Sequence, residues 1–98
     1  MKKIIVACGN GVATSQMVAY KVNKMLRNRH ITDVYVEAVD IRSLRRHLQD
    51  TIAYIEIMHN EQDLGVPKID GMAFLTGKNL KREFTYLLKI IKNSQEEK

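Results

Sequence analysis

The sequence predicts an α/β protein built on a single four-stranded parallel sheet, with helices on both faces in a three-layer α/β/α arrangement. Short apolar segments rich in β-branched residues alternate along the chain with segments of helical periodicity. The first apolar segment, residues 4–7, shows no polar alternation, which is typical of a strand buried on both faces of a parallel sheet. The right-handed crossover rule then limits the order of the strands. We expect the Rossmann-like order 2-1-3-4.

The expected elements alternate along the chain. Strands are expected over residues 4–7, 34–39, 52–58 and 72–75, the last of them between Gly71 and Gly77. Helices are expected after Ser15, over residues 41–48 and after Asn79, which can cap the last helix. Residues 59–70 are polar and contain the one proline, so they are expected to form a long loop.

Length and composition limit the class of protein. A chain of 98 residues with 45% hydrophobic and 28% charged residues is one ordinary globular domain, and not a disordered chain or a coiled coil. We expect this domain over residues 1–93, followed by a polar, frayed tail over 94–98. A lone cysteine excludes an internal disulfide and fits a reducing compartment. With no signal peptide or membrane-spanning stretch in the sequence, a cytoplasmic location is expected.

The segment from Cys8 to Ser15 carries the chemistry. It follows the first expected strand and leads into the first expected helix. None of its residues is proline, so every backbone N–H remains available, and its two glycines allow close approach to a ligand. Such a loop before a helix N-terminus is suited to binding phosphate. The expected cradle is made of Gly9, Asn10, Gly11, Val12, Ala13, Thr14 and Ser15, with Thr14 and Ser15 as hydroxyl donors or helix caps.

The dipoles that bind phosphate also stabilise a thiolate, so Cys8 is a candidate nucleophile toward phosphorus and would form S-phosphocysteine. A buried structural thiol is the simpler alternative. A phosphatase of the low-molecular-weight type needs an arginine six positions after the cysteine, where this chain has Thr14. A thiol reductase would need a second cysteine. A regulatory interaction module that retains the loop stays open as an alternative.

Two segments resemble a known family. KKIIVACGNGVATSQM is similar to the active-site segment of the phosphotransferase-system (PTS) enzyme IIB family, in particular its galactitol-type members, whose cysteine loop reads C-G-x-x-V-A-T-S. Val66-Pro67 and the segment DGMAFLTG resemble that branch's I-P…hG-M-P-F-[LV]-[ST]-G, with Ala73 in place of the proline. The resemblance covers about residues 2–91.

The resemblance implies a cytoplasmic phosphoryl carrier, a protein-N-phosphohistidine–sugar phosphotransferase. Cys8 would accept a phosphoryl group from a phosphohistidine of the IIA component. It would donate that group to a sugar or polyol, galactitol-like in class, bound by the membrane permease IIC. Neither a metal nor an organic cofactor is implied for this step.

Other polar features are given minor roles. The cluster of Arg42, Arg45, Arg46 and His47 is expected to be a solvated helix face, with docking to an acidic partner as the alternative. The three histidines, His30, His47 and His59, lack the spacing of metal ligands, and only His59 is expected near the rim of the site. With 6% aromatic residues and no recognition motif, the chain is not expected to bind nucleic acid.

Overall fold

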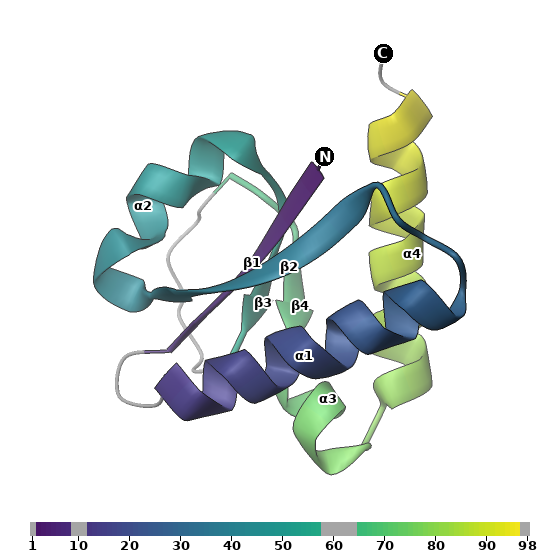
Figure 1. Cartoon of the computed structure of the whole chain (residues 1–98), viewed down its shortest axis with the longest axis horizontal. Coiled ribbons are helices and arrows are strands. Elements are labelled where there is room, and N and C mark those ends of the chain that lie inside the picture. The colour runs from purple at the N-terminus through teal and green to yellow at the C-terminus, as the bar shows by residue number, and fades with distance from the viewer. Residues whose placement is uncertain (1, 9–11, 58–64, 97–98) are drawn as a thin grey trace.

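The computed structural model of the chain describes residues 2–8, 12–57 and 65–96 (Figure 1). The strands are β1 (Lys2–Cys8), β2 (Val34–Asp40), β3 (Thr51–Glu56) and β4 (Lys68–Asp70). The helices are α1 (Val12–Asn28), α2 (Leu44–His47), α3 (Met72–Thr76) and α4 (Leu80–Glu96). Short 3-10 turns, Ile41–Ser43 and Leu48–Asp50, flank α2, so the basic helix expected over 41–48 is present as one α turn extended at both ends.

The described strands form one parallel sheet with the order β2-β1-β3-β4, which confirms the predicted class and strand order. The two inner strands, β1 and β3, have neighbours on both sides, and their residues 4–7 and 53–55 are almost fully buried. This explains why residues 4–7 are apolar without alternation, because helices cover both faces of β1, the strand to which these residues belong.

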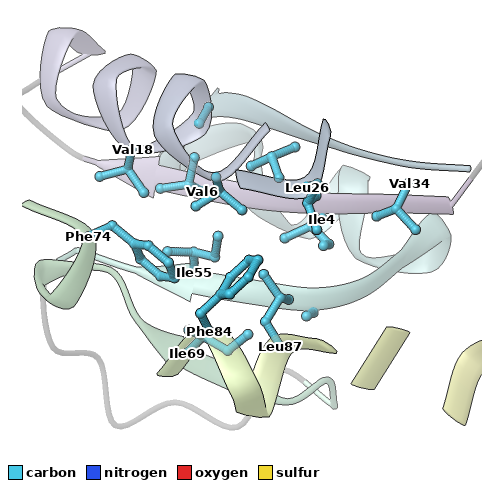
Figure 2. Close-up of a cluster of buried hydrophobic side chains, with 14 of the residues drawn as sticks. Ile4, Val6, Val18, Leu26, Val34, Ile55, Ile69, Phe74, Phe84 and Leu87 are labelled. Carbon is cyan, nitrogen blue, oxygen red and sulfur yellow. The ribbon is translucent and has the colours of Figure 1, made fainter. Parts of the chain in front are cut away.

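The helices cover the two faces of the sheet unequally. The larger core lies between the sheet and α1, α3 and α4, where Val18, Phe74 and Leu87 pack against Ile4 and Ile55 (Figure 2). On the other face, Leu44 of α2 packs with Ile5, Ala7 and the buried ring of Tyr54. The alternation of Ile4 and Ile5 between these two cores follows from the period of two in a strand.

The fourth strand is not where the sequence predicts it. Residues 72–75, expected as a strand, belong to helix α3, and the strand is Lys68–Asp70 within the expected loop. The ladder ends at Gly71, whose N–H donates to the carbonyl of Glu56 at 2.7 Å. Beyond it the chain turns into α3, which buries Ala73 and Phe74 and leaves Met72 exposed. Short apolar runs fit either a strand or a helix, so periodicity alone does not separate the two.

Helix ends also differ from expectation. Helix α4 continues through Ser94 to Glu96, beyond the position at which the polar tail was expected to begin, and the Ser94 carbonyl accepts a hydrogen bond from Lys2 Nζ at 2.9 Å. Asn79 precedes α4 as expected, but with φ 62, and its carbonyl accepts the N–H of Glu83. Helix α1 ends in a Schellman motif: Ile31 donates to Leu26, and His30 donates to Arg27 with φ 62.

Candidate functional site

Cys8 is the last residue of β1, an inner strand of the sheet. In the sheet, β2 lies on one side of β1 and β3 lies on the other. The direction in which successive strands are added to the sheet therefore reverses between β1 and β3. In open parallel sheets, ligands bind beyond the C-terminal ends of the strands at such a reversal. The described backbone therefore puts Cys8 at the position where this architecture places its sites.

Helix α1 begins at Val12, four positions after Cys8 in the sequence. Its first N–H groups have no intrahelical partner and carry a partial positive charge that favours an anion. No acidic residue lies in the first turn of the helix to offset that charge. The predicted loop residues Gly9, Asn10 and Gly11, and the side chains of Cys8, Val12 and Ala13, lie outside the described residues.

Thr14 and Ser15 lie inside the first turn of α1 because the helix starts at Val12. Their predicted role as residues that cap the helix is therefore wrong, since a capping residue stands before the first helical position. Ser15 is buried, with 1% of its surface exposed, whereas Thr14 is half-buried. Of these two hydroxyl residues, Thr14 is the one with access to solvent.

Carboxylates end the other three strands, a feature that the sequence interpretation missed. Asp40 ends β2, Glu56 ends β3 and Asp70 ends β4. Parallel pairing brings them to one edge of the sheet: Cys8 pairs with Asp40, Ala7 with Glu56, and Glu56 with Asp70. The sequence carries a signal for this arrangement, because an acidic residue is the last residue of each of these three strands, but the signal can be recognised only once the strand ends are known.

Asp40 is held by Arg42 from the turn that follows β2. Its Oδ1 accepts the backbone N–H of Arg42 at 2.8 Å, and its Oδ2 accepts from Arg42 Nη2 at 2.8 Å. The hydrogen bonds from the guanidinium, and next the one from the backbone, lower the pKa of the Asp40 carboxyl to about 2. The charge of this carboxylate is therefore compensated at the edge where Cys8 ends its strand.

Glu56 and Asp70 are engaged as well. Lys68 Nζ lies 3.6 Å from Glu56 Oε2, and the Glu56 side chain is 14% exposed. Asp70 Oδ1 accepts the N–H of Met72 at 3.0 Å, at the start of α3. Cationic or N–H partners thus accompany all three carboxylates, which lowers the cost of bringing a further anion to this edge.

The remaining predicted features are placed as follows. Arg42 forms the ion pair with Asp40, while Arg45 and Arg46 are exposed on α2, as expected for a solvated face. His47 Nδ1 accepts from the buried Lys3 near the start of β1, and His30 lies after α1, so neither is at the edge with Cys8. His59 lies outside the described residues.

The described part of the chain contains no group of three or more His, Cys, Asp or Glu side chains placed to hold a metal ion. Nor does any helix within residues 12–57 or 65–96 combine the length and apolar character needed to cross a membrane.

Comparison with known proteins gives consistent matches. Residues 3–85 match the family model described as "PTS system, Lactose/Cellobiose specific IIB subunit". The chain is 33% identical over 91 residues to "Putative phosphotransferase enzyme IIB component SgcB" of Escherichia coli (strain K12), covering 90% of this chain and 98% of that protein. It is 31% identical over 80 residues to the "PTS system galactitol-specific EIIB component" of the same organism, covering 78% of this chain and 81% of that protein.

Proposed function

Since the chain belongs to the IIB subunit family of the sugar phosphotransferase system, we propose that Cys8 is its phosphoryl-carrying residue. The position of Cys8 carries this proposal: it ends an inner strand at the reversal of strand order, four positions before the N-terminus of a long helix. The N-terminal charge of α1 stabilises both a thiolate and the phosphoryl group that it would hold.

The transfer has two steps. In the first, the Cys8 thiolate attacks the phosphorus of a phosphohistidine on the IIA component; the P–S bond forms as the P–N bond breaks, and the imidazole leaves. In the second, a hydroxyl oxygen of the sugar attacks phosphorus. The P–O bond forms as the P–S bond breaks, the thiolate is regenerated, and a base of the partner takes the hydroxyl proton.

The backbone N–H groups of residues 9–15 are proposed to bind the three phosphoryl oxygens in both steps. Donors that are already in place need little reorganisation as charge moves from nitrogen to sulfur and from sulfur to oxygen. Thr14 is proposed to add a hydroxyl donor, which its partial exposure permits. Ser15 contributes its backbone N–H, since its side chain is buried.

The partners are proposed from the family. The donor is a IIA component, and the acceptor is a sugar or polyol held by the membrane component IIC. One relative is galactitol-specific by name, whereas the family model is lactose/cellobiose-specific by description. We therefore propose a sugar or polyol as the acceptor, with its identity set by the IIC component that binds it. The lone cysteine supports a reducing, cytoplasmic location.

Phosphorylation of the purified chain tests this function. Incubation with phosphoenolpyruvate, the general phosphotransferase proteins and the cognate IIA component should add one phosphoryl group, located on Cys8 by mass spectrometry. Cys8→Ser should accept none and should keep the circular dichroism spectrum of the wild type.

A relocated thiol provides the matched control. The double variant Cys8→Ser/Thr85→Cys carries its thiol on an exposed position of α4 and should also remain unphosphorylated. Phosphoryl transfer to Cys8→Ser would show that another residue is the acceptor. Rapid hydrolysis of a phosphotyrosine mimic by the wild type would favour a phosphatase instead.

A further inference from the structure

The helices on one face of the sheet carry many exposed cations on their outer surface. Nine exposed basic residues lie on these helices or next to them: Lys21, Lys24, Arg27, Arg29, Lys78, Lys81, Arg82, Lys89 and Lys92. Over the same described stretches, residues 12–31 and 71–94, the sequence contains one acidic residue, Glu83. The nine basic residues are termed the cationic face below.

Glu83 offsets little of this charge. Its side chain is 14% exposed, and its Oε1 accepts the backbone N–H of Asp70 at 2.8 Å. Its Oε2 lies 3.5 Å from Nε of the neighbouring Arg82. The carboxylate is therefore held against the end of β4. Outside these stretches, exposed Asp33 lines a hollow together with Arg29 and Lys92, so one further carboxylate lies at the edge of the cationic face.

The two long helices that carry most of the cationic face, α1 and α4, pack on the same side of the sheet (Figure 2). On α4, Lys81, Lys89 and Lys92 follow helical spacing and point to one side. Two exposed tyrosines lie on the same helices: Tyr20 is 64% exposed and Tyr86 is 43% exposed. Tyrosine combines an apolar ring with a polar tip and is enriched where protein meets a membrane surface.

We propose that the cationic face binds the surface of an anionic lipid bilayer. A broad, mainly positive surface matches a plane of negative headgroups. Clusters of about four to eight basic residues on a helix are typical of such binding, and each long helix, counted with the residue that follows it, contributes four: Lys21, Lys24, Arg27 and Arg29 with α1, and Lys81, Arg82, Lys89 and Lys92 with α4. Most of the nine residues are lysines, whose flexible point charges suit diffuse attraction to headgroups better than paired recognition of single carboxylates.

An acidic protein is the rival partner, and the structure favours it less. A protein interface needs a desolvated apolar centre within its polar rim. The apolar hollow in this face is a groove of about 450 Å³ between α1 and α4, lined by residues that include Met25, Leu80 and Phe84. The Arg29 guanidinium lies over it, 5.3 Å from the centre of the Phe84 ring, so a cation already covers the deepest apolar side chain.

Binding through this face would leave Cys8 accessible. The basic residues of α1 lie from Lys21 to its C-terminal end, whereas Cys8 precedes the N-terminal end. At a rise of about 1.5 Å per residue, Lys21 lies roughly 13 Å and Arg27 roughly 22 Å along the helix from Val12, so these cations lie beyond the end of α1 that follows Cys8. The proposal does not depend on the function of Cys8, and either can fail without the other.

Co-sedimentation with lipid vesicles tests the proposal. At roughly physiological ionic strength, about 0.15 M, the full chain should sediment with phosphatidylcholine vesicles containing roughly one third phosphatidylglycerol, and not with phosphatidylcholine alone. The double variant Lys81→Glu/Lys89→Glu should lose at least about tenfold in affinity for the anionic vesicles. Cys8→Ser should bind them as the wild type does.

The control variant changes net charge equally on the opposite face. Arg45→Glu/Arg46→Glu, on α2, also exchanges two exposed cations for two anions and should lose no more than about threefold. Equal losses in the two double variants would overturn the proposal, because net charge alone would then explain the binding. Failure of the wild type to bind anionic vesicles would also overturn the proposal. Binding to soluble polyglutamate but not to anionic vesicles would be one such result.

Discussion

Cys8 and Asp40 are direct partners in the parallel ladder between β1 and β2, so the cysteine and a carboxylate end adjacent strands side by side. A bare carboxylate at that position would raise the pKa of the thiol and repel phosphate. Arg42 offsets this charge by binding Asp40 through both its guanidinium and its backbone N–H. If Cys8 carries a phosphoryl group, as proposed, this ion pair lowers the electrostatic cost of a second anion beside it.

Arg42→Ala should therefore lower the reactivity of Cys8. With Asp40 uncompensated, the thiol pKa should rise, and alkylation by iodoacetamide at neutral pH should slow by roughly two- to fivefold. Asp40→Asn should have the opposite effect, because it removes the negative charge itself. The two variants are compared by the pH dependence of the alkylation rate. Equal rates in both variants and the wild type would show that Cys8 does not sense this ion pair.

Asp40 should also give the protein an acid-sensitive contribution to stability. Its pKa in the folded chain, about 2, lies below the ordinary value of 3.8, so the folded state favours the ionised carboxylate. The contribution should be fully present above about pH 4 and should be lost as the pH falls toward about 2. The difference in unfolding free energy between wild type and Asp40→Asn, measured in urea, should shrink over this interval. A constant difference would contradict the pairing.

Gly71→Ala should destabilise the junction between β4 and α3. A Cβ at this position would lie 2.8 Å from Cδ1 of Ile57 and 2.9 Å from the backbone oxygen of Glu56. The backbone oxygen cannot move without disturbing the end of β3, so we expect a loss of about 1–3 kcal/mol in unfolding free energy. Gly77→Asn is the control: Gly77 has φ 82 and open space around it, and asparagine tolerates that conformation. Gly77→Asn should lower the unfolding free energy less than Gly71→Ala does. A larger loss for Gly77→Asn would contradict the steric argument.

Asn23→Ala should weaken the outer edge of the sheet. The Asn23 side chain, from α1, accepts the N–H of Val36 at 2.9 Å and donates to the carbonyl of Val36 at 3.0 Å, as a neighbouring strand would. Removing it should cost about 1–3 kcal/mol, because two backbone groups of edge strand β2 lose their partner. The exposed edge should also increase aggregation, measured by light scattering at the same temperature. The unfolding free energy of Asn23→Asp, which retains only the acceptor, should lie between those of the wild type and Asn23→Ala.

The sequence was sufficient for the class of fold and the position of the candidate cysteine. The uninterrupted apolar run of residues 4–7 and the helical spacing of Val18, Val22 and Leu26 are strong local signals, and the structure confirms both elements. Crossover handedness then limits the strand order. Cys8 follows from its place at the end of the first strand, which the sequence marks by the glycines after it.

The tertiary structure decided what local pattern could not. Residues 72–75 became helix α3 because pairing with β3 ends at Gly71, a constraint that lies in another strand. The ion pair of Asp40 and Arg42 lies beside the end of β1 only because parallel pairing brings together residues far apart in the chain. Likewise, the cationic face exists because α1 and α4 pack on the same side of the sheet. The spacing of apolar residues determines which face of each segment can be buried. The residues that this face contacts depend on strand register and packing across the whole molecule.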